Sequence, residues 1–360
     1  MQRQKPEKWL SLLSRNTNRQ MLAPRAVCMN YMGSKTKLLS FIDSVVTDCE
    51  SKIGLKRKAR FTDLFGGSGK VSEFYKNRFN VTANDIEFYS YVTLKNILQA
   101  DTAVAASVDG YLYFLNHSLG IEGFINQNYS PAGGRMFFTE INSQLIDAAV
   151  THVQHLRSIK VLSKKQYFYL LGCILEAASK VANTAGHTAG YLKRIYPRAE
   201  KRIVFEHLNL AELKNKNNNV ISMDASCAIE ELSGDILYLD PPYTFNYSRM
   251  YHLLNTIVKN DEPEITGKVG LRKDVNKSPW SDSRKAKVVM NDILEKADFR
   301  YVIMSYSNES RMKPETIADI FSAHGKYSCF TQEHPRYRAA KAANSPAFVT
   351  EYLHVLKKKV

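Results

Sequence analysis

The stretch DILYLDPPYTFNYSRMYHLL (235–254) contains the pattern that decides the fold. Residues 236–239 are apolar, which predicts a buried strand. The two prolines after Asp240 fix φ and donate no backbone hydrogen bond, so they end this strand in a rigid loop. The Asp240 side chain, the Pro241 carbonyl and the Tyr243 ring should then lie at the carboxyl end of the strand, where open α/β sheets bind ligands. Two acceptors and an aromatic plane suit a flat group with an amino edge.

Strand and helix patterns alternate on both sides of this stretch. FTDLFGGSGKVSEFYK (61–76) is typical of strand, glycine-rich turn and helix, and residues 80–98 repeat strand and helix with an acidic residue between them. The pattern resumes at 220–232 and continues through 299–310 and 348–358. Successive βα units predict an α/β fold, a Rossmann-like parallel sheet with helices on both faces.

This alternation is interrupted in the middle of the chain. Residues 117–147 are rich in loop formers, a 3.6-residue apolar period follows at 167–181, and residues 181–202 are rich in basic side chains. We interpret 105–215 as a largely helical insertion. The sheet domain would then comprise 26–104 and 216–360, with residues 1–25 as a basic N-terminal arm.

Composition narrows the class of protein. The chain has 360 residues, 44% of them hydrophobic, and 50 Lys plus Arg against 35 Asp plus Glu, a formal charge of +15. This surplus favours a polyanionic partner such as nucleic acid, although solvated lysines alone would also produce it. The five cysteines are scattered without a C-x-x-C pair, and we expect no metal. Without a long apolar run or a signal sequence, the expected location is the cytoplasm.

The glycine-rich turn DLFGGSG (63–69) follows a strand and opens a helix. Glycines there let a ligand approach the backbone, and a helix N-terminus favours polar groups. Leu64 stands where a P-loop requires glycine, and Ser72 stands where the dinucleotide fingerprint requires it. The turn therefore predicts a small cofactor over the first strand, with an ordinary tight turn as the alternative. The candidate cofactor residues here are Asp63, Leu64, Phe65, Gly67, Ser68 and Gly69.

Two more carboxylates follow strands. Asp85, with Ile86, comes 18 residues after Gly67, an offset at which a carboxylate can accept hydrogen bonds from ribose hydroxyls. Asp224, with Ala225, is placed to accept an adenine amino group. The alternative for each aspartate is a helix N-cap.

Taken in order, these motifs resemble the alpha-group (D12 class) DNA adenine-N6 methyltransferases of restriction-modification type. The resemblance extends from about residue 30, where YMGSKTKLL (31–39) is similar to the opening motif of the family. The tetrapeptide DPPY, at Asp240, Pro241, Pro242 and Tyr243, matches its catalytic motif. The resemblance implies a methyltransferase that takes S-adenosylmethionine as cofactor and modifies adenine in double-stranded DNA. It also adds Tyr31, Met32, Gly33, Lys35 and Asp240 to the cofactor-binding candidates.

The implied chemistry assigns roles to the tetrapeptide. Asp240 and the Pro241 carbonyl would accept hydrogen bonds from N6 of a flipped-out adenine, and Tyr243 would stack on the base. Cytosine-C5 methylation needs a cysteine nucleophile, in that family after proline, and none of the cysteines follows proline. The alternatives that stay open are an RNA adenine-N6 methyltransferase and a DNA-binding module that keeps the fold without turnover.

DNA contacts are expected from the basic part of the insertion, which would be the target-recognition region. The candidates are Arg135, Lys193, Arg194, Arg198, Lys201 and Arg202. Residues 248–254 and 278–287 are expected to form a second DNA-facing loop. Lys35 could contact the cofactor or DNA, or lie on a solvated helix face. We expect a monomer with no membrane contact, and the resemblance allows a cognate restriction endonuclease as partner.

Overall fold

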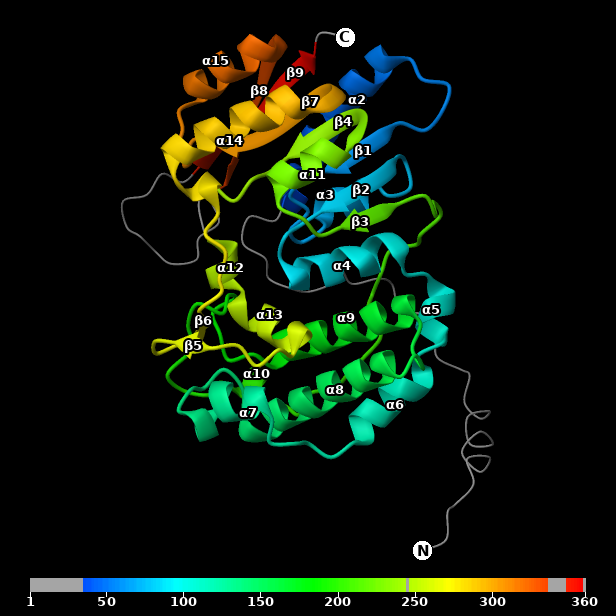
Figure 1. Ribbon diagram of the computed structural model, residues 1–360, viewed down its shortest axis with the longest axis vertical. Helices are drawn as coiled ribbons and strands as arrows, with labels where there is room; N and C mark the ends of the chain where they lie inside the picture. Colours follow the sequence, from blue (N-terminus) through cyan, green and yellow to red (C-terminus); the bar gives the residue numbers. More distant parts are fainter. Residues whose placement is uncertain (1–34, 244–245, 336–347, 359–360) are drawn as a thin grey trace, which may run out of the picture.

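Two bodies make up the part of the chain that the computed structural model describes, residues 35–243, 246–335 and 348–358. The upper body in Figure 1 is a seven-stranded sheet with helices on both faces, and the lower body is a cluster of helices. This confirms the expected α/β fold with a mostly parallel sheet.

The sheet has the strand order β3-β2-β1-β4-β7-β9-β8. Its first five strands pair in parallel, whereas β9 runs antiparallel to both β7 and β8. The sequence patterns predicted every strand except β8, which is polar, mostly exposed and at the edge of the sheet, so no apolar run marks it. The strands are β1 (Arg60–Asp63), β2 (Asn80–Asn84), β3 (Asn219–Ile221), β4 (Ser233–Leu239), β7 (Asp298–Ser307), β8 (Gly325–Pro335) and β9 (Phe348–Lys358).

Alternating side chains of the central strands build two apolar layers. Phe61, Ile236 and Tyr238 face one layer, covered by α2 (Leu39–Ile53), α3 (Lys70–Tyr75) and α4 (Phe88–Gln99). Leu237 and Leu239 face the other, covered by α11 (Ala225–Glu231), α14 (Ser283–Lys296) and α15 (Pro314–His324). Burial on both faces explains why β4 is an unbroken apolar run rather than an alternating one.

The strand order creates a topological switch point at β1. The chain leaves β1 for β2 on one side, and β4 pairs with β1 on the other. Asp63 at the end of β1 lies in register with Tyr238, two residues before Asp240. The carboxyl ends of adjacent parallel strands form a crevice at such a point, so the motifs after β1, β2 and β4 converge there.

The helical body is built from two separate segments of the chain. The first supplies α5 (Thr102–Ala106), α6 (Asp109–His117), α7 (Phe124–Tyr129), α8 (Glu140–Ser158), α9 (Lys164–Val181), α10 (Pro197–Glu200) and the short η2 (Pro131–Gly133). The second supplies α12 (Tyr247–Met250), α13 (His252–Lys259) and the hairpin β5–β6 (Ile265–Thr266, Leu271–Arg272). The domain boundary predicted at residue 216 therefore leaves out part of the helical body.

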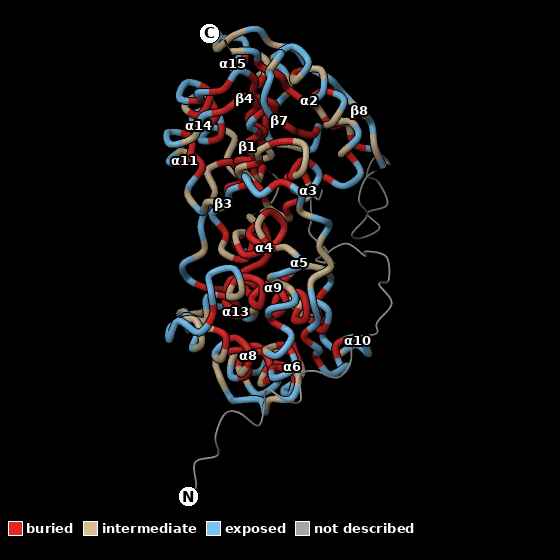
Figure 2. Tube along the Cα trace, turned by 90° about the vertical axis from the view of Figure 1, so that its right-hand side faces the viewer, coloured by how far each residue is buried: buried red, intermediate tan, exposed pale blue. Residues whose placement is uncertain are grey.

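Helix α4 belongs to both bodies. Its Leu94, Ile97 and Leu98 pack in the layer under the sheet, whereas Tyr89 and Val92 pack in the core of the helical body. Figure 2 shows the buried α4 at the junction of the two bodies. We infer that the two bodies unfold together, because each would lose part of its core without this helix.

Replacing Ile97 by alanine tests this inference. The side chain is 1% exposed, so the cavity should lower the free energy of unfolding by about 2–5 kcal/mol. Far-UV circular dichroism and tryptophan fluorescence should report one shared transition at a lower denaturant midpoint. Val288→Ala, at a position 70% exposed, is the control and should change stability by less than about 0.5 kcal/mol. Two separate transitions would contradict the shared core.

Candidate active site

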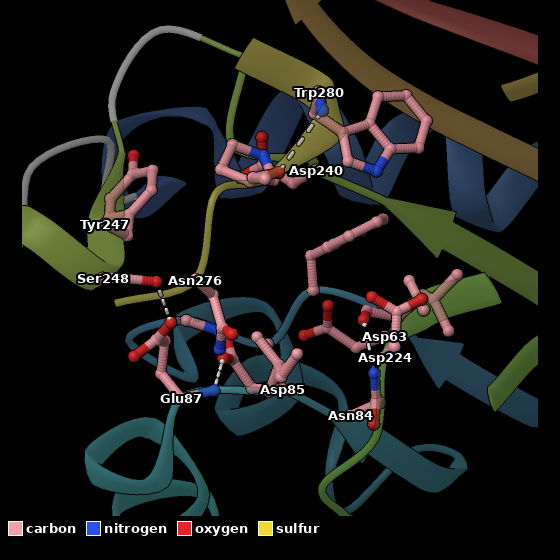
Figure 3. A pocket seen from close by; sticks show the side chains of 18 of the residues that line it. Asp63, Asn84, Asp85, Glu87, Asp224, Asp240, Tyr247, Ser248, Asn276 and Trp280 are labelled. Carbon is pink, nitrogen blue, oxygen red and sulfur yellow. Dashed lines mark hydrogen bonds between the residues drawn. The ribbon is translucent and has the colours of Figure 1, made fainter. Parts of the chain in front are cut away.

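A cavity of about 210 Å³ lies at the switch point, at the carboxyl ends of β1, β2 and β4. Figure 3 shows carboxylates on several of its walls, with Asp240 and Trp280 across from Asp85 and Glu87. Most of the predicted cofactor residues line it: Lys35, Asp63, Leu64, Phe65, Gly67, Ser68, Asp85, Ile86, Asp224, Ala225 and Asp240. Gly69 does not, and Tyr31, Met32 and Gly33 lie outside the described residues.

The glycine-rich turn packs directly on helix α4. A Cβ added to Gly66 would lie 2.7 Å from a Leu94 methyl carbon, and one on Gly69 would lie 2.5 Å from the Ile97 side chain. Gly69 also has a φ of +74°, in the left-handed region that favours glycine. These close approaches explain why the turn needs glycine, and they aim the backbone of 65–68 into the cavity.

Asp85 secures this turn from the neighbouring strand. One carboxylate oxygen accepts from the Gly67 N–H at 2.7 Å and the other from the Glu87 N–H at 2.8 Å. The N-cap position of α4 is Glu87, so the alternative reading of Asp85 as that N-cap is wrong. Burial raises the pKa of Asp85 to about 6, against the two backbone hydrogen bonds that favour the ionised form.

Asp63 has an unsatisfied acceptor beside the cavity. Its Oδ2 accepts from the Ser72 hydroxyl at 2.7 Å, whereas its buried Oδ1 has no hydrogen-bond partner among the described residues. Burial raises the pKa of Asp63 to about 7, and the nearby charges of Asp240 and Asp85 add to this effect. A buried acceptor without a donor marks a place where a ligand could supply one.

Asp224 confirms the helix N-cap considered for it and also lies in the cavity wall. It is the N-cap residue of α11, with Oδ1 accepting from the Ser226 N–H at 2.9 Å, and its side chain also lines the cavity. In Figure 3 it lies near Asp63 on the same wall.

Asp240 is held by a buried lysine. The Lys35 ammonium, in the short helix η1 (Lys35–Leu38), lies 3.0 Å from Asp240 Oδ1, 3.2 Å from Glu351 Oε1 and 3.5 Å from the Tyr243 hydroxyl. Lys35 is 7% exposed, which rules out the solvated helix face considered for it. Although burial opposes the charged form, Asp240, Tyr243 and Glu351 together raise the pKa of Lys35. Burial raises the pKa of Asp240 to about 6, while Lys35 works in the opposite direction.

The remaining tetrapeptide residues differ in exposure to the cavity. Pro242 lines it, and the Pro241 carbonyl accepts from the Tyr243 N–H at 2.8 Å, which closes a tight turn. The Tyr243 ring is 9% exposed and packs 4.3 Å from the Tyr306 ring. Tyr247, which no sequence pattern singled out, places its aromatic ring in the wall instead.

The residues in or beside the cavity that were not predicted as site residues include Glu87, Trp280 and Glu351. Glu87 accepts hydrogen bonds from Ser248 and Asn255, which ties the start of α4 to α12 and α13. Trp280, in the short helix η3 (Pro279–Ser281), is 2% exposed and contacts Phe65 edge to face. Glu351 comes from β9, far along the chain. For Trp280, the sequence offered one signal, since tryptophan is rare in this chain. The places of Glu87 and Glu351 beside the cavity depend on tertiary contacts.

The second DNA-facing loop predicted from 248–254 and 278–287 does not form as a loop. Residues 252–258 are buried in helix α13, because their apolar side chains complete the helical core. Residues 278–280 turn inward and line the cavity.

The predicted DNA-contact residues divide into two groups. The Arg135 guanidinium donates to the carbonyls of Asn128, Gly133, Gly267 and Lys268, so it joins the helical body to the β5–β6 hairpin. Arg198 donates to the carbonyls of Ala182 and Thr184. Lys193, Arg194, Lys201 and Arg202 form the second group and are exposed; Arg198 is also exposed, despite its hydrogen bonds.

Several of these residues line a groove of about 680 Å³ on the helical body. Its basic wall contains Lys180, His187, Arg198, Lys201 and Arg202, with Glu206 as the acidic exception. Tyr251 and Leu254 form part of the apolar floor, only a few residues beyond Tyr247 in the cavity wall. The groove and the cavity are therefore connected through α12 and α13.

The described residues contain neither a metal-binding group nor a membrane-spanning helix. The ranges 35–243, 246–335 and 348–358 contain no group of three or more His, Cys, Asp or Glu side chains that could hold a metal ion. No helix in these ranges has the length and apolar character needed to cross a membrane.

Comparisons with known proteins agree with this geometry. A sequence model of the D12 class N6 adenine-specific DNA methyltransferases matches residues 31–320. The chain is 35% identical over 337 residues to the Type II methyltransferase M.NlaIII of Neisseria lactamica, which covers 92% of this chain and 99% of that protein. It is 32% identical over 324 residues to the modification methylase LlaI of Lactococcus lactis subsp. lactis (86% of this chain, 51% of that protein). It is also 32% identical over 349 residues to the Type II methyltransferase M.FokI of Planomicrobium okeanokoites (92% and 53%).

The chain thus spans nearly all of the first relative and about half of the other two. The match to the family covers the glycine-rich turn, the carboxylates after β2 and β3, and the DPPY loop. It confirms the family that these motifs resemble: the chain belongs to the D12 class N6 adenine-specific DNA methyltransferases.

Proposed function

We propose that the chain transfers the methyl group of S-adenosylmethionine to N6 of an adenine within a specific sequence of double-stranded DNA, with Asp240 as the principal catalytic residue. The observation that carries this proposal is the Asp240–Lys35 pair at the edge of a carboxylate-lined cavity. Family membership supports the adenine target and the methyl donor.

The cavity suits a positively charged cofactor. S-adenosylmethionine carries a sulfonium and an amino group, and when bound it supplies the reactive methyl group. The desolvated carboxylates of Asp63, Asp85 and Asp240 favour such a cation, because each has a raised pKa that a nearby positive charge would lower. We assign the unpaired Asp63 Oδ1 to the amino group, Asp85 to the ribose hydroxyls and Asp224 to the adenine amino group.

Asp240 and the proline after it would orient the acceptor nitrogen. Lys35 occupies Asp240 Oδ1, so Oδ2 can accept one N6–H hydrogen bond. The Pro241 carbonyl can accept the other with its second lone pair, since the Tyr243 N–H uses only one. Two acceptors turn the nitrogen lone pair toward the methyl group, and the Asp240 charge stabilises positive charge that develops on N6.

The target base has to leave the duplex to reach this loop. An adenine stacked in B-form DNA cannot contact the floor of a cavity, so we propose a flipped-out base. The Tyr243 ring, expected to stack on it, is packed on Tyr306, and the Tyr247 ring in the cavity wall offers a second stacking surface.

The basic groove on the helical body is the proposed DNA-binding surface. Its exposed cations suit phosphate contacts, which set affinity and salt dependence but not sequence preference. Lys193 and Arg194 extend the exposed charge along the same segment. The tightly bonded Arg135 and Arg198 would instead shape this surface, and a DNA contact from either remains a prediction.

Replacing Asp240 by alanine tests the proposed catalytic role. We expect methyl transfer to fall by at least about 100-fold, because the charge and acceptor at N6 are lost. Cofactor affinity should fall by much less, because Asp63, Asp85 and Asp224 still line the cavity. Single-turnover transfer to DNA, together with sequencing of genomic DNA from a methylation-free host expressing each variant, measures the effect. N6-methyladenine at one short motif, present with the wild type and absent with Asp240→Ala, is the expected result; an active variant would refute the role of Asp240.

The raised pKa values predict how activity depends on pH. Asp240 must be ionised to accept the N6–H bond, so activity should be lost as the pH falls through about 6. Because bound cofactor lowers the pKa values of the neighbouring carboxyls, kcat should hold to a lower pH than kcat/KM for the cofactor. Steady-state rates measured from pH 5 to 9 check this order. A kcat/KM profile that stays flat through pH 6 would contradict it.

Two double variants, each of which removes two positive charges, test the groove as the DNA-binding surface. Lys201→Ala/Arg202→Ala should weaken DNA binding and reduce the slope of log K against log salt by about 2. Lys56→Ala/Lys326→Ala removes the same charge from exposed positions on the sheet body and should leave the slope within error. Fluorescence anisotropy with labelled duplex at several salt concentrations measures both. Equal slopes for the two variants would exclude the groove as the phosphate site.

A further inference from the structure

Glu351 is a buried acid that the chemistry described above does not use. It lies in β9, beyond the residues that match the family, and its side chain is 3% exposed. Its Oε1 accepts from the Lys35 ammonium at 3.2 Å and from the Ser305 hydroxyl, and its Oε2 lies 3.9 Å from the His334 ring. β9 pairs with β7 and β8 on either side, so the carboxylate has a fixed position.

The three contacts of Lys35 use its whole donor capacity. An ammonium has three N–H donors, and Lys35 has acceptors in Asp240 Oδ1, Glu351 Oε1 and the Tyr243 hydroxyl. Glu351 therefore determines where the ammonium lies relative to Asp240. Without that anchor, the ammonium could move to bridge both oxygens of Asp240.

The net charge of this cluster depends on His334. Lys35 contributes one positive charge and Asp240 and Glu351 contribute two negative ones, so the cluster is negative while His334 is neutral; His334, whose pKa Glu351 raises, adds a second positive charge when it is protonated. Although burial opposes ionisation of Glu351, Lys35, His334 and Ser305 hold its pKa at about 2, so it stays charged throughout the working range. The other titratable groups that face the two carboxylates are Tyr238, Tyr243, Tyr247, Asp63 and His354. The Glu351 charge raises the pKa of Asp240, in opposition to Lys35.

We infer that Glu351 is a positioning residue for methyl transfer: it anchors Lys35 on one oxygen of Asp240, so that the other oxygen stays available to the target amino group, and its charge keeps Asp240 a strong acceptor. This inference rests on the proposed role of Asp240. It makes the last long strand of the sheet part of the catalytic machinery, through Lys35 rather than through contact with the substrate.

Glu351→Gln tests the inference, because it keeps Oε1 for Lys35 and Ser305 and removes only the charge. In a plot of the single-turnover rate against pH, the acid limb, where the rate falls at low pH, should move down by about one pH unit. The rate on the plateau above that limb should fall by up to about tenfold. The KM for S-adenosylmethionine should stay within about twofold. Lys35→Met removes the opposing charge and should move the acid limb up. The double variant should bring the limb back toward the wild-type position.

A folding defect cannot produce limb shifts of opposite sign. Ser305→Ala is the matched control, since it removes a hydrogen bond to Glu351 without changing charge, and its acid limb should stay at the wild-type pH. An unchanged limb in Glu351→Gln, or a shift in the same direction as Lys35→Met, overturns the inference. If Asp240→Ala is inactive in that case, the proposed function stands and only the role of Glu351 fails. If Asp240→Ala is active, the proposed role of Asp240 fails, and the inference about Glu351 fails with it.

Discussion

Parallel pairing of β1 with β2 and β4 is the constraint on which the site depends. Parallel strands in register end at one edge of the sheet, so Asp63, Asp85 and Asp240 meet there although they are far apart in the chain. The glycine-rich turn can then lie flat on α4, where added Cβ atoms would collide with Leu94 and Ile97. The shape of the cavity follows from strand register and from glycine, not from any single polar contact.

Bringing carboxylates together in a desolvated place has an electrostatic consequence. Burial is the main cause of the raised pKa values at Asp63, Asp85 and Asp240, and mutual repulsion adds to it at Asp63. Among these three carboxylates, only Asp240 has a cation within ion-pair distance, Lys35, in the part of the chain that the structure describes. The carboxylates of Asp63 and Asp85 would therefore favour a positive charge from outside the chain, which fits the proposed sulfonium donor.

The helical body is connected to this chemistry through a small number of buried contacts. Glu87 follows β2 and holds Ser248 and Asn255, which lie just after the DPPY loop. Helix α13 then completes the helical core and supplies part of the floor of the basic groove. A DNA strand on the groove and a base in the cavity would therefore contact opposite ends of the same short segment, so DNA position and catalytic-loop position are mechanically linked.

The sequence alone predicted the α/β class and nearly every strand of the sheet, and most of the cofactor residues that it predicted line the cavity. It could do so because apolar runs, glycine turns and strand-end acids are local signals of 3 to 10 residues. Edge strand β8 lacks an apolar run and was missed. The helical body also takes residues 247–272, which no composition change marks.

Contacts across the sheet decided what the local signals left open. The pairing of Lys35 with Asp240 and Glu351 joins residues near both ends of the chain, and the hydrogen bonds of Arg135 join two loops of the helical body. A sequence pattern records what each residue type can do, but burial and the neighbours brought in by folding determine which of those possibilities is used. For this reason the sequence determined the fold class and the family. Only the tertiary structure showed that Lys35 is buried beside the cavity rather than solvated, and that Arg135 is bonded to backbone carbonyls.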